Sequence, residues 1–379
     1  MIQSYIDKGW VKGVATIIVK DNRLVQYKGY GYADAEAKKP MEKDAIFRIM
    51  SQTKAITSVG IMVLYEQGKL TLDEPVSDFI PEFAHQTVLA KFNAADTTYT
   101  TVPARRDITI RDLLTHTSGL DYNDIGTPAG NAIYTNAGIP SGLGYFNANL
   151  LEKMKLLAKQ PLLFQPGEKW QYSLSVDLLG CIIEVISHQS LEQFFQKNIF
   201  GPLGMKDTYF NVPASKANRL AAVYTEDNQH NVIRWDHQYR HIDPDYPLMN
   251  KHYFSGGAGL SSTAFDYAIF MQMLLNGGIY NGHRILSPRT VQLMTSNQLD
   301  FTFNGMDNFG LGFQLTSAKS ANKLPRNEGS FGWGGFYNSV YWADPKAHLV
   351  CVFVLQQTPN SHYDIETKFE DLVYSSLLK

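Results

Sequence analysis

The sequence predicts an α+β fold, an α/β sandwich plus a helical lobe, with one antiparallel sheet built from strands at both ends of the chain. Runs rich in β-branched and aromatic residues lie near both termini, whereas the middle of the chain alternates helical patterns with long loops. A chain of 379 residues can also bury a large core and form more than one lobe. We therefore expect an α/β domain over residues 1–75 and 165–379, a mostly helical lobe over residues 76–164, and an active site at their interface.

The N-terminal segments predict a hairpin followed by a strand and a buried helix. Residues 13–19 and 24–30 are β-rich runs separated by the polar sequence KDNR, which is typical of a hairpin. Residues 46–50 have a strand-like pattern, and residues 51–66 are apolar on nearly every face. A helix of that kind is buried on most sides.

The remaining segments predict helices first and strands afterwards. Helical patterns cover residues 110–116, 149–158, 175–188 and 264–276. Strand patterns return at residues 310–316, 339–342 and 348–355, and an amphipathic helix is predicted at residues 363–378. We expect residues 14–19 and 350–355 to pair in one sheet, with the last helix packed on it.

Composition and charge exclude several classes of protein. The chain is 44% hydrophobic and 18% charged with a net charge of −2, and its Lys and Arg residues are scattered, so no nucleic-acid or anionic-membrane partner is expected. Cys181 and Cys351 lie in apolar runs and are expected to be free core thiols. No apolar run approaches the ~20 residues of a membrane span. No signal peptide is visible, so we expect a soluble protein that is cytoplasmic, or periplasmic or secreted if a leader was removed. The sequence gives no signal for the oligomeric state.

A Ser-x-x-Lys motif gives the first chemical signal. Ser51 would begin the buried helix, and Lys54 would lie one turn on, on the same face. Free backbone N–H groups and the helix dipole at such a position stabilise an alkoxide or an oxyanion. A lysine in apolar surroundings loses hydration, which disfavours its charged form and allows it to act as a base. The spacing recurs at Ser320 and Ser376, but in a polar loop and at the chain end, and the alternative for Ser51 is a simple N-cap.

Several further motifs follow in a fixed order. They are LLTHTSGL at 113–120, Pro-Gly-Glu at 166–168 leading to Tyr172, GPLGM at 201–205 and GGAGL at 256–260. Together with FRIMSQTKAITSVGIMVLYEQGKLTLDEPVSDFIPEF at 47–83, this set resembles the serine β-lactamase and penicillin-binding protein superfamily, in its class C-related branch. The resemblance covers most of the chain and implies the β-lactamase/D,D-peptidase-like fold with Ser51 as nucleophile.

The second motif of that superfamily is a Tyr-x-Asn, which brings another proton-transfer group to the serine. Tyr172-Ser173-Leu174 occupies this context, so the tyrosine is retained and the asparagine is not. Three Tyr-x-Asn triplets elsewhere, at Tyr134, Tyr145 and Tyr209, lack the Pro-Gly lead-in and are interpreted as loop or core tyrosines. The alternative for Tyr172 is an aromatic residue that merely starts a helix.

The third motif is usually Lys-Thr-Gly or His-x-Gly on an inner strand, and here it is Trp333-Gly334-Gly335. Two adjacent glycines allow a substrate to approach the strand closely. By the resemblance, the N–H of Phe336 would join that of Ser51 as the oxyanion hole. The alternative is a core tryptophan beside a bulge.

The departures from the family pattern predict the substrate. A Lys at the third motif and an Asn at the second help a β-lactamase hold a carboxylate and an amide, and losing the buried cation costs on the order of 2–5 kcal/mol of recognition. Trp333 and Leu174 would form aromatic and aliphatic substrate-binding walls instead, which favour apolar groups. Tyr-Ser-Leu with Trp-Gly-Gly is similar to the family VIII carboxylesterases. We therefore expect a serine hydrolase that forms an acyl-enzyme on Ser51 and cleaves short-chain or neutral esters, with Lys54 and Tyr172 as its acid/base pair and with no cofactor or metal.

Other interpretations stay open. They are a β-lactamase, a D,D-peptidase or D-aminopeptidase acting on an amide, and a non-catalytic penicillin-binding-like module. Arg234 or Arg240 could replace the missing cation. His237 and His241 have a His-x-x-x-His spacing without the Glu of a zinc motif, so we expect solvated histidines there. His116 is expected to tie its helix end to a loop, and no Gly-x-Ser-x-Gly elbow supports an α/β-hydrolase.

Overall fold

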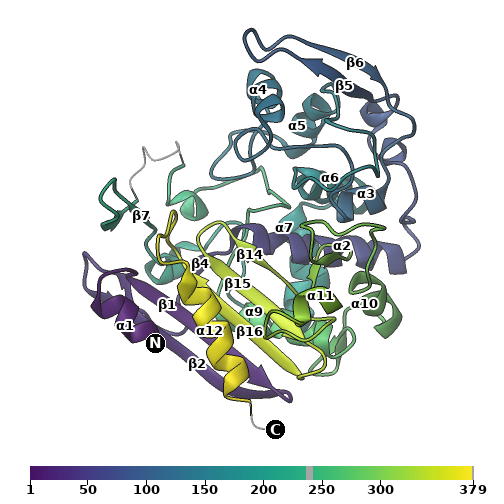
Figure 1. The fold of residues 1–379 in the computed structure, drawn as a ribbon. Helices are drawn as coiled ribbons and strands as arrows, with labels where there is room; N and C mark the ends of the chain where they lie inside the picture. The colour runs from purple at the N-terminus through teal and green to yellow at the C-terminus, as the bar shows by residue number, and fades with distance from the viewer. Residues whose placement is uncertain (236–241, 378–379) are drawn as a thin grey trace.

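A computed structural model describes residues 1–235 and 242–377 and has an eight-stranded antiparallel sheet at its centre (Figure 1). Its strand order is β12-β13-β14-β15-β16-β1-β2-β3. In that order the strands are Asn308–Phe309, Gln314–Leu315, Phe331–Gly335, Ser339–Asp344, Leu349–Leu355, Gly13–Lys20, Arg23–Asp34 and Lys39–Pro40. Strands from the two ends of the chain therefore lie side by side, and the predicted fold class is confirmed.

The join between the two ends is the pairing of β1 with β16. Val14 lies opposite Leu355, and Val19 lies opposite Val350, as predicted. The β1–β2 hairpin closes through Asp21 and Asn22, which both have positive φ angles. Such a two-residue turn matches the twist of the flanking strands and suits Asp and Asn.

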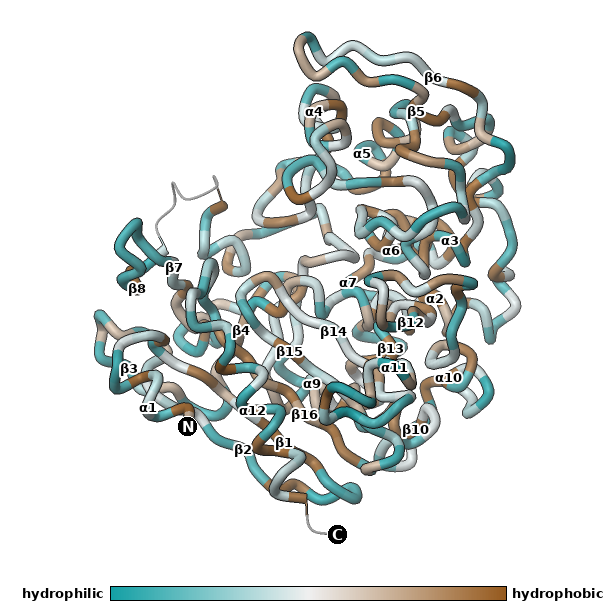
Figure 2. Tube along the Cα trace, in the orientation of Figure 1, coloured by the Kyte–Doolittle hydropathy of each residue, from teal (hydrophilic) through white to brown (hydrophobic). Residues whose placement is uncertain are grey.

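Both faces of the sheet are covered, because side chains alternate along each strand. Cys351 and Phe353 of β16 face α1 (Ile2–Asp7) and α12 (Asp364–Ser375), whereas Val350 and Val352 face the other core. That second core contains α2 (Thr53–Glu66) and α9 (Ala264–Leu275). Hydrophobic residues, brown in Figure 2, recur along these central strands, and hydrophilic residues gather in the peripheral turns. The buried helix predicted at residues 51–66 is confirmed.

The other helices gather mainly beyond one edge of the sheet (Figure 1). They are α3 (Ile110–Leu114), α4 (Pro128–Asn136), α5 (Leu150–Leu157), α6 (Ser175–Ser187), α7 (Leu191–Phe195), α8 (Gly201–Leu203), α10 (Pro288–Met294) and α11 (Ala318–Ala321). Short strand pairs accompany them: β4 (Phe47–Arg48) with β9 (Ser261–Ser262), β5 (Thr87–Phe92) with β6 (Tyr99–Pro103), β7 (Tyr224–Glu226) with β8 (Val232–Arg234), and β10 (Ile279–Tyr280) with β11 (His283–Arg284). Helix α6 packs against α2, α3 and α5. The domain boundaries given above remain a prediction.

Three sequence-based assignments need correction. The strand predicted at 310–316 shortens to β13 at Gln314–Leu315. Residues 310–313 form the turn between β12 and β13, in which Gly312 has a φ of 89° and approaches α2 so closely that a Cβ would lie 2.2 Å from Ser58 Oγ. The strand predicted at 46–50 shortens to β4. The hairpin β5–β6 was not predicted, because its strands are largely exposed and lack the buried alternation that marks most strands.

Candidate active site

Ser51 lies in a short 3₁₀ turn, Met50–Gln52, directly before α2. The turn begins with a strained residue, because Met50 has a φ of 49°. Met50 is fully buried, and its sulfur accepts a hydrogen bond from Tyr246 Oη at 3.6 Å, so packing holds this conformation. Ser51 itself is half-buried, which leaves its hydroxyl accessible at the head of the helix.

The three residues predicted to act together do lie together. Tyr172 Oη donates a hydrogen bond to Ser51 Oγ at 2.5 Å, and Lys54 Nζ lies 3.4 Å from the same oxygen. The ammonium also lies 4.5 Å from the centre of the Tyr172 ring, within cation–π range. Lys54 is only 4% exposed, so solvent provides little stabilisation of its charge. The site therefore has one accessible hydroxyl with two proton-transfer groups beside it.

The segment matched by GGAGL fixes the start of α2, a role that the sequence did not assign. Lys54 Nζ donates to the Gly257 carbonyl at 2.8 Å, and Thr57 Oγ1 donates to the Gly256 carbonyl at 2.7 Å. The Leu260 N–H donates to Thr53 Oγ1 at 3.2 Å. These bonds hold Lys54 and the helix entrance in one position.

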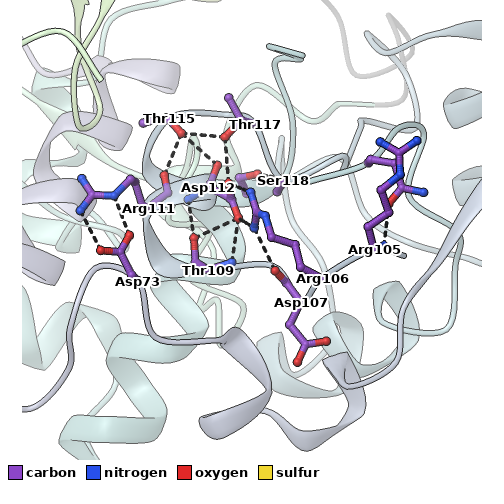
Figure 3. A network of polar contacts seen from close by, with 12 residues as sticks. Asp73, Arg105, Arg106, Asp107, Thr109, Arg111, Asp112, Thr115, Thr117 and Ser118 are labelled. Carbon is purple, nitrogen blue, oxygen red and sulfur yellow. Dashed lines mark hydrogen bonds and ion pairs between the residues drawn. The ribbon is translucent and has the colours of Figure 1, made fainter. Parts of the chain in front are cut away.

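The LLTHTSGL element supports the tyrosine side of the site through a polar network (Figure 3). Asp112 accepts hydrogen bonds from the Thr109 backbone N–H at 2.9 Å and from Thr117 Oγ1 at 3.2 Å, and it pairs with Arg106 at 2.5 Å. This network fixes the turn that contains His116. The network is a strong one because its donors, among them the charged Arg106, are all directed at the Asp112 carboxylate.

His116 ties this turn to the segment around Tyr172, in line with its predicted structural role. Its carbonyl accepts from the Gln171 N–H at 2.9 Å, and its Nδ1 lies 3.2 Å from Ser173 Oγ. Its ring packs 5.1 Å from that of Tyr172. Burial, aided by the nearby Lys54 charge, lowers the pKa of His116 well below its usual value, so the imidazole is neutral near pH 7.

The third motif lies next to the nucleophile, as the resemblance implied. The Trp333 ring lies 5.6 Å from the Tyr172 ring. Gly335, the last residue of β14, approaches the chain so closely that a Cβ would lie 2.8 Å from the Ile49 carbonyl oxygen. Phe336 follows Gly335 directly and Ser51 follows Ile49 by two positions, so the backbones of the two residues predicted for the oxyanion hole are brought to neighbouring segments.

Several aromatic residues around the site were missed by sequence reasoning. The Trp170 ring lies 4.8 Å from that of Phe303, 5.6 Å from that of Phe309 and 6.3 Å from that of Trp333. Tyr122 packs 5.4 Å from Tyr172. Trp170 lies in the Pro-Gly lead-in and could have been found there, whereas Phe303, in a loop, and Phe309, in the short strand β12, come from a distant segment with no motif of its own.

A cavity of about 270 Å³ adjoins the third motif. Trp333 and Gly334 form part of its lining, together with polar side chains that include Gln314 and Arg326. Arg326 is paired with Glu370 at 2.7 Å, so its positive charge is already compensated.

Two predictions about substrate contacts do not agree with the structure. Leu174 is 0% exposed and belongs to the main hydrophobic core, so it does not form a wall of an open site. Arg234 pairs with Asp34 at 2.8 Å and Glu36 at 3.3 Å, so it does not offer a free cation. His237, Arg240 and His241 lie outside the described residues.

The family model described as Beta-lactamase matches residues 1–374. The chain belongs to the β-lactamase family. Esterase EstB of Burkholderia gladioli is 30% identical over 369 residues, which cover 91% of this chain and 86% of EstB. Protein Rv1367c of Mycobacterium tuberculosis is 35% identical over 377 residues, 96% of this chain and 90% of that protein.

Two further proteins resemble the chain over similar lengths. A putative D-alanyl-D-alanine carboxypeptidase of Escherichia coli is 28% identical over 385 residues, 95% of this chain and 81% of that protein. The solved structure titled "EstCE1, a hydrolase with promiscuous acyltransferase activity" has a TM-score of 0.82 and 28% identity, covering 98% of this chain and 96% of that one. These relatives place the chain in the serine hydrolase superfamily. In the described part of the chain, no helix is both long and apolar enough to cross a membrane.

Proposed function

We propose that this member of the β-lactamase family is a carboxylesterase that hydrolyses short-chain or neutral esters through an acyl-enzyme on Ser51. The observation that supports it most directly is the 2.5 Å hydrogen bond from Tyr172 Oη to Ser51 Oγ, with Lys54 Nζ 3.4 Å from the same oxygen. A buried lysine and a phenol beside one accessible serine match the needs of an activated nucleophile. A non-catalytic module would need none of these contacts.

In the proposed reaction, Lys54 and Tyr172 together take the proton from Ser51 Oγ as that oxygen bonds to the acyl carbon. The carbonyl oxygen becomes an oxyanion, held by the backbone N–H groups of Ser51 and Phe336. When the tetrahedral intermediate collapses, the bond to the alkoxy oxygen breaks, and Tyr172 returns a proton to the leaving alcohol. Water then attacks the acyl-enzyme with the same pair as base, which releases the acid and restores Ser51.

Charge compensation supports a neutral substrate. Arg234 is a cation that could have held a substrate carboxylate, but it is already paired with Asp34 and Glu36. The third motif presents the Trp333 ring, and aromatic surface favours an apolar alkoxy or acyl group at about 25 cal/mol per Å² buried. At Gly334 the absence of a side chain allows such a group to approach β14, since an added Cβ there would meet the Ser339 carbonyl oxygen at 3.2 Å. The name of EstB agrees with this choice.

The alternative is hydrolysis of a β-lactam or a D-alanyl peptide, which the family name and the carboxypeptidase-like relative make the natural rival. The deciding experiment compares kcat/KM for p-nitrophenyl butyrate, nitrocefin and a D-Ala-D-Ala peptide on one preparation. We expect the ester to be cleaved best. A higher kcat/KM for either of the other two would replace the esterase assignment with the lactamase or peptidase one.

A further inference from the structure

Asp177 is a buried carboxylate beside the site that no motif singles out. It lies in the first turn of α6 and is 0% exposed. Its Oδ1 accepts a hydrogen bond from Ser255 Oγ at 2.5 Å, and within the described residues its Oδ2 has no hydrogen-bond partner. A buried carboxylate is costly unless another charge compensates it. Its surroundings should therefore contain a cation.

Gly257 connects Asp177 to Lys54. Its carbonyl accepts the 2.8 Å hydrogen bond from Lys54 Nζ, and its backbone N–H faces the carboxylate. A Cβ on Gly257 would lie 2.4 Å from Asp177 Oδ2 and 3.3 Å from Lys54 Nζ. Both side chains therefore pack against this glycine, and their opposite charges face each other across one residue in buried surroundings.

Three further titratable side chains near this pair stay neutral near pH 7. Burial lowers the pKa of the histidine and raises the pKa of the two tyrosines, and these residues are His116, Tyr122 and Tyr253. Burial also raises the pKa of Asp177, but Lys54, the Ser255 hydroxyl and the Gly257 N–H all oppose that shift. Asp177 is thus the carboxylate whose charge can act on Lys54.

We propose that Asp177 is a positioning residue for Lys54: its carboxylate is the buried counter-charge of the ammonium and, through Gly257, holds the amine within reach of Ser51 Oγ. This inference rests on the proposed function of Ser51 and Lys54. It assigns a role to the first turn of α6 and explains why glycine stands at 257. The proton balance of Lys54 and Tyr172 then depends on a charge that never touches the substrate.

The test measures the rate at which a fluorophosphonate labels Ser51 between pH 5 and 10, in the wild type and in Asp177→Asn. We expect at least tenfold slower labelling at the wild-type optimum. The plot of labelling rate against pH should have a limb that is set by the Lys54–Tyr172 pair. We expect the midpoint of this limb to lie about one to two pH units lower in Asp177→Asn, because the ammonium form of Lys54 loses its nearby negative charge. A residue needed only for folding would not move this midpoint.

Glu184→Gln is the matched control. Glu184 lies two turns further along α6, its Oε1 accepts a hydrogen bond from the Leu191 N–H at 2.8 Å, and burial raises its pKa to about 6. It is a half-buried, hydrogen-bonded carboxylate on the same helix, further from the helix start that faces Lys54. We expect its variant to keep the wild-type rate and profile.

A second variant covers the case in which Asp177→Asn does not fold. Asp177→Leu combined with Ser255→Ala replaces the hydrogen-bonded pair by apolar groups, which buried sites often tolerate. The midpoint should move in the same direction. Unmoved midpoints in the folded variants overturn the proposal. Labelling needs no ester substrate. If the wild type is labelled on Ser51 but cleaves no ester, the proposed esterase activity is refuted, while the comparison of labelling rates still decides the role of Asp177. Absence of labelling on Ser51 overturns both the proposed function and the role of Asp177.

Discussion

Tyr172 Oη donates a 2.5 Å hydrogen bond to the Ser51 hydroxyl, although the two residues are 121 positions apart in the sequence. Each lies shortly before a buried helix, Ser51 two positions before α2 and Tyr172 three positions before α6, and these two helices pack against each other. The contact between the two hydroxyl groups is therefore set by the packing of two rigid elements. Sites built in this way hold their geometry more accurately than sites on loops.

The first prediction concerns the nucleophile. Ser51→Ala should abolish ester hydrolysis and prevent covalent labelling, because Ser51 Oγ is the aliphatic hydroxyl that lies 3.4 Å from Lys54 Nζ and 2.5 Å from Tyr172 Oη. Intact-protein mass spectrometry after exposure to a fluorophosphonate measures this directly. Ser320→Ala, which alters another Ser-x-x-Lys serine, is the control and should still label. An adduct on a serine other than Ser51 would contradict the assignment.

The second prediction separates the hydroxyl of Tyr172 from its ring. General acid/base groups contribute ~10²–10⁴-fold to rate, so Tyr172→Phe should lower kcat by that order while the thermal unfolding temperature stays close to wild type. The matched control is Tyr209→Phe, which removes the hydroxyl of a tyrosine whose Oη bonds to the Lys206 carbonyl. If Tyr172→Phe keeps kcat within threefold of wild type, the phenol takes no part in proton transfer.

Much of the fold could be predicted from the sequence because its signals are local. The β-branched runs that form β1 and β16 and the all-apolar helix α2 each show a pattern that needs no knowledge of distant residues. Their pairing follows from connection rules that leave few topologies for strands at both ends of a chain. Ser51, Lys54 and Tyr172 were found because they lie in motifs.

The rest of the site depends on contacts between distant segments. Phe303 and Phe309 reach Trp170 from a loop and from the short strand β12, whose positions no local pattern defines. Asp177 looks like an ordinary acidic residue in the first turn of a helix, and only the tertiary structure puts Lys54 and Gly257 beside it. Leu174 was misjudged for the same reason, since a motif position does not reveal whether its side chain faces the core.

The third prediction tests the close approach of β14 to the nucleophile. A Cβ on Gly335 would lie 2.4 Å from Ser339 Oγ and 2.8 Å from the Ile49 carbonyl oxygen, so Gly335→Ala must push the strand away from Ser51. Removing one oxyanion-hole donor costs about 10²–10³-fold in kcat, and we expect a loss of at least tenfold here.

Gly334→Ala is the control for this strand displacement. The nearest atom to a Cβ on Gly334 is the Ser339 carbonyl oxygen at 3.2 Å, which requires a much smaller adjustment. Steady-state kinetics on one ester should therefore give a larger fall in kcat for Gly335→Ala than for Gly334→Ala. Equal losses would mean that the Ile49 contact does not position the oxyanion hole.

The fourth prediction concerns the pH dependence of stability. Glu366 of α12 has a buried Oε1 without a hydrogen-bond partner in the described structure, and burial raises its pKa from 4.5 to about 7, partly opposed by Arg326. The folded state therefore holds the carboxyl proton more tightly than the unfolded chain does. This contribution to stability is complete below pH 4.5 and is lost as the pH rises to about 7.

Glu366→Gln removes this titration while it keeps the shape of the side chain. The free energy of unfolding of the variant, relative to wild type, should rise by about 1–2 kcal/mol between pH 4.5 and 7.5, a value reduced for the partial exposure of the side chain. Urea unfolding at four pH values across this range measures the difference. Glu370→Gln is the contrasting variant, because it breaks the 2.7 Å pair with Arg326 and should lower stability at neutral pH. If the stabilities of wild type and Glu366→Gln change in parallel with pH, Glu366 is ionised in the folded protein, and Arg326 compensates its charge more strongly than the burial of Oε1 opposes it.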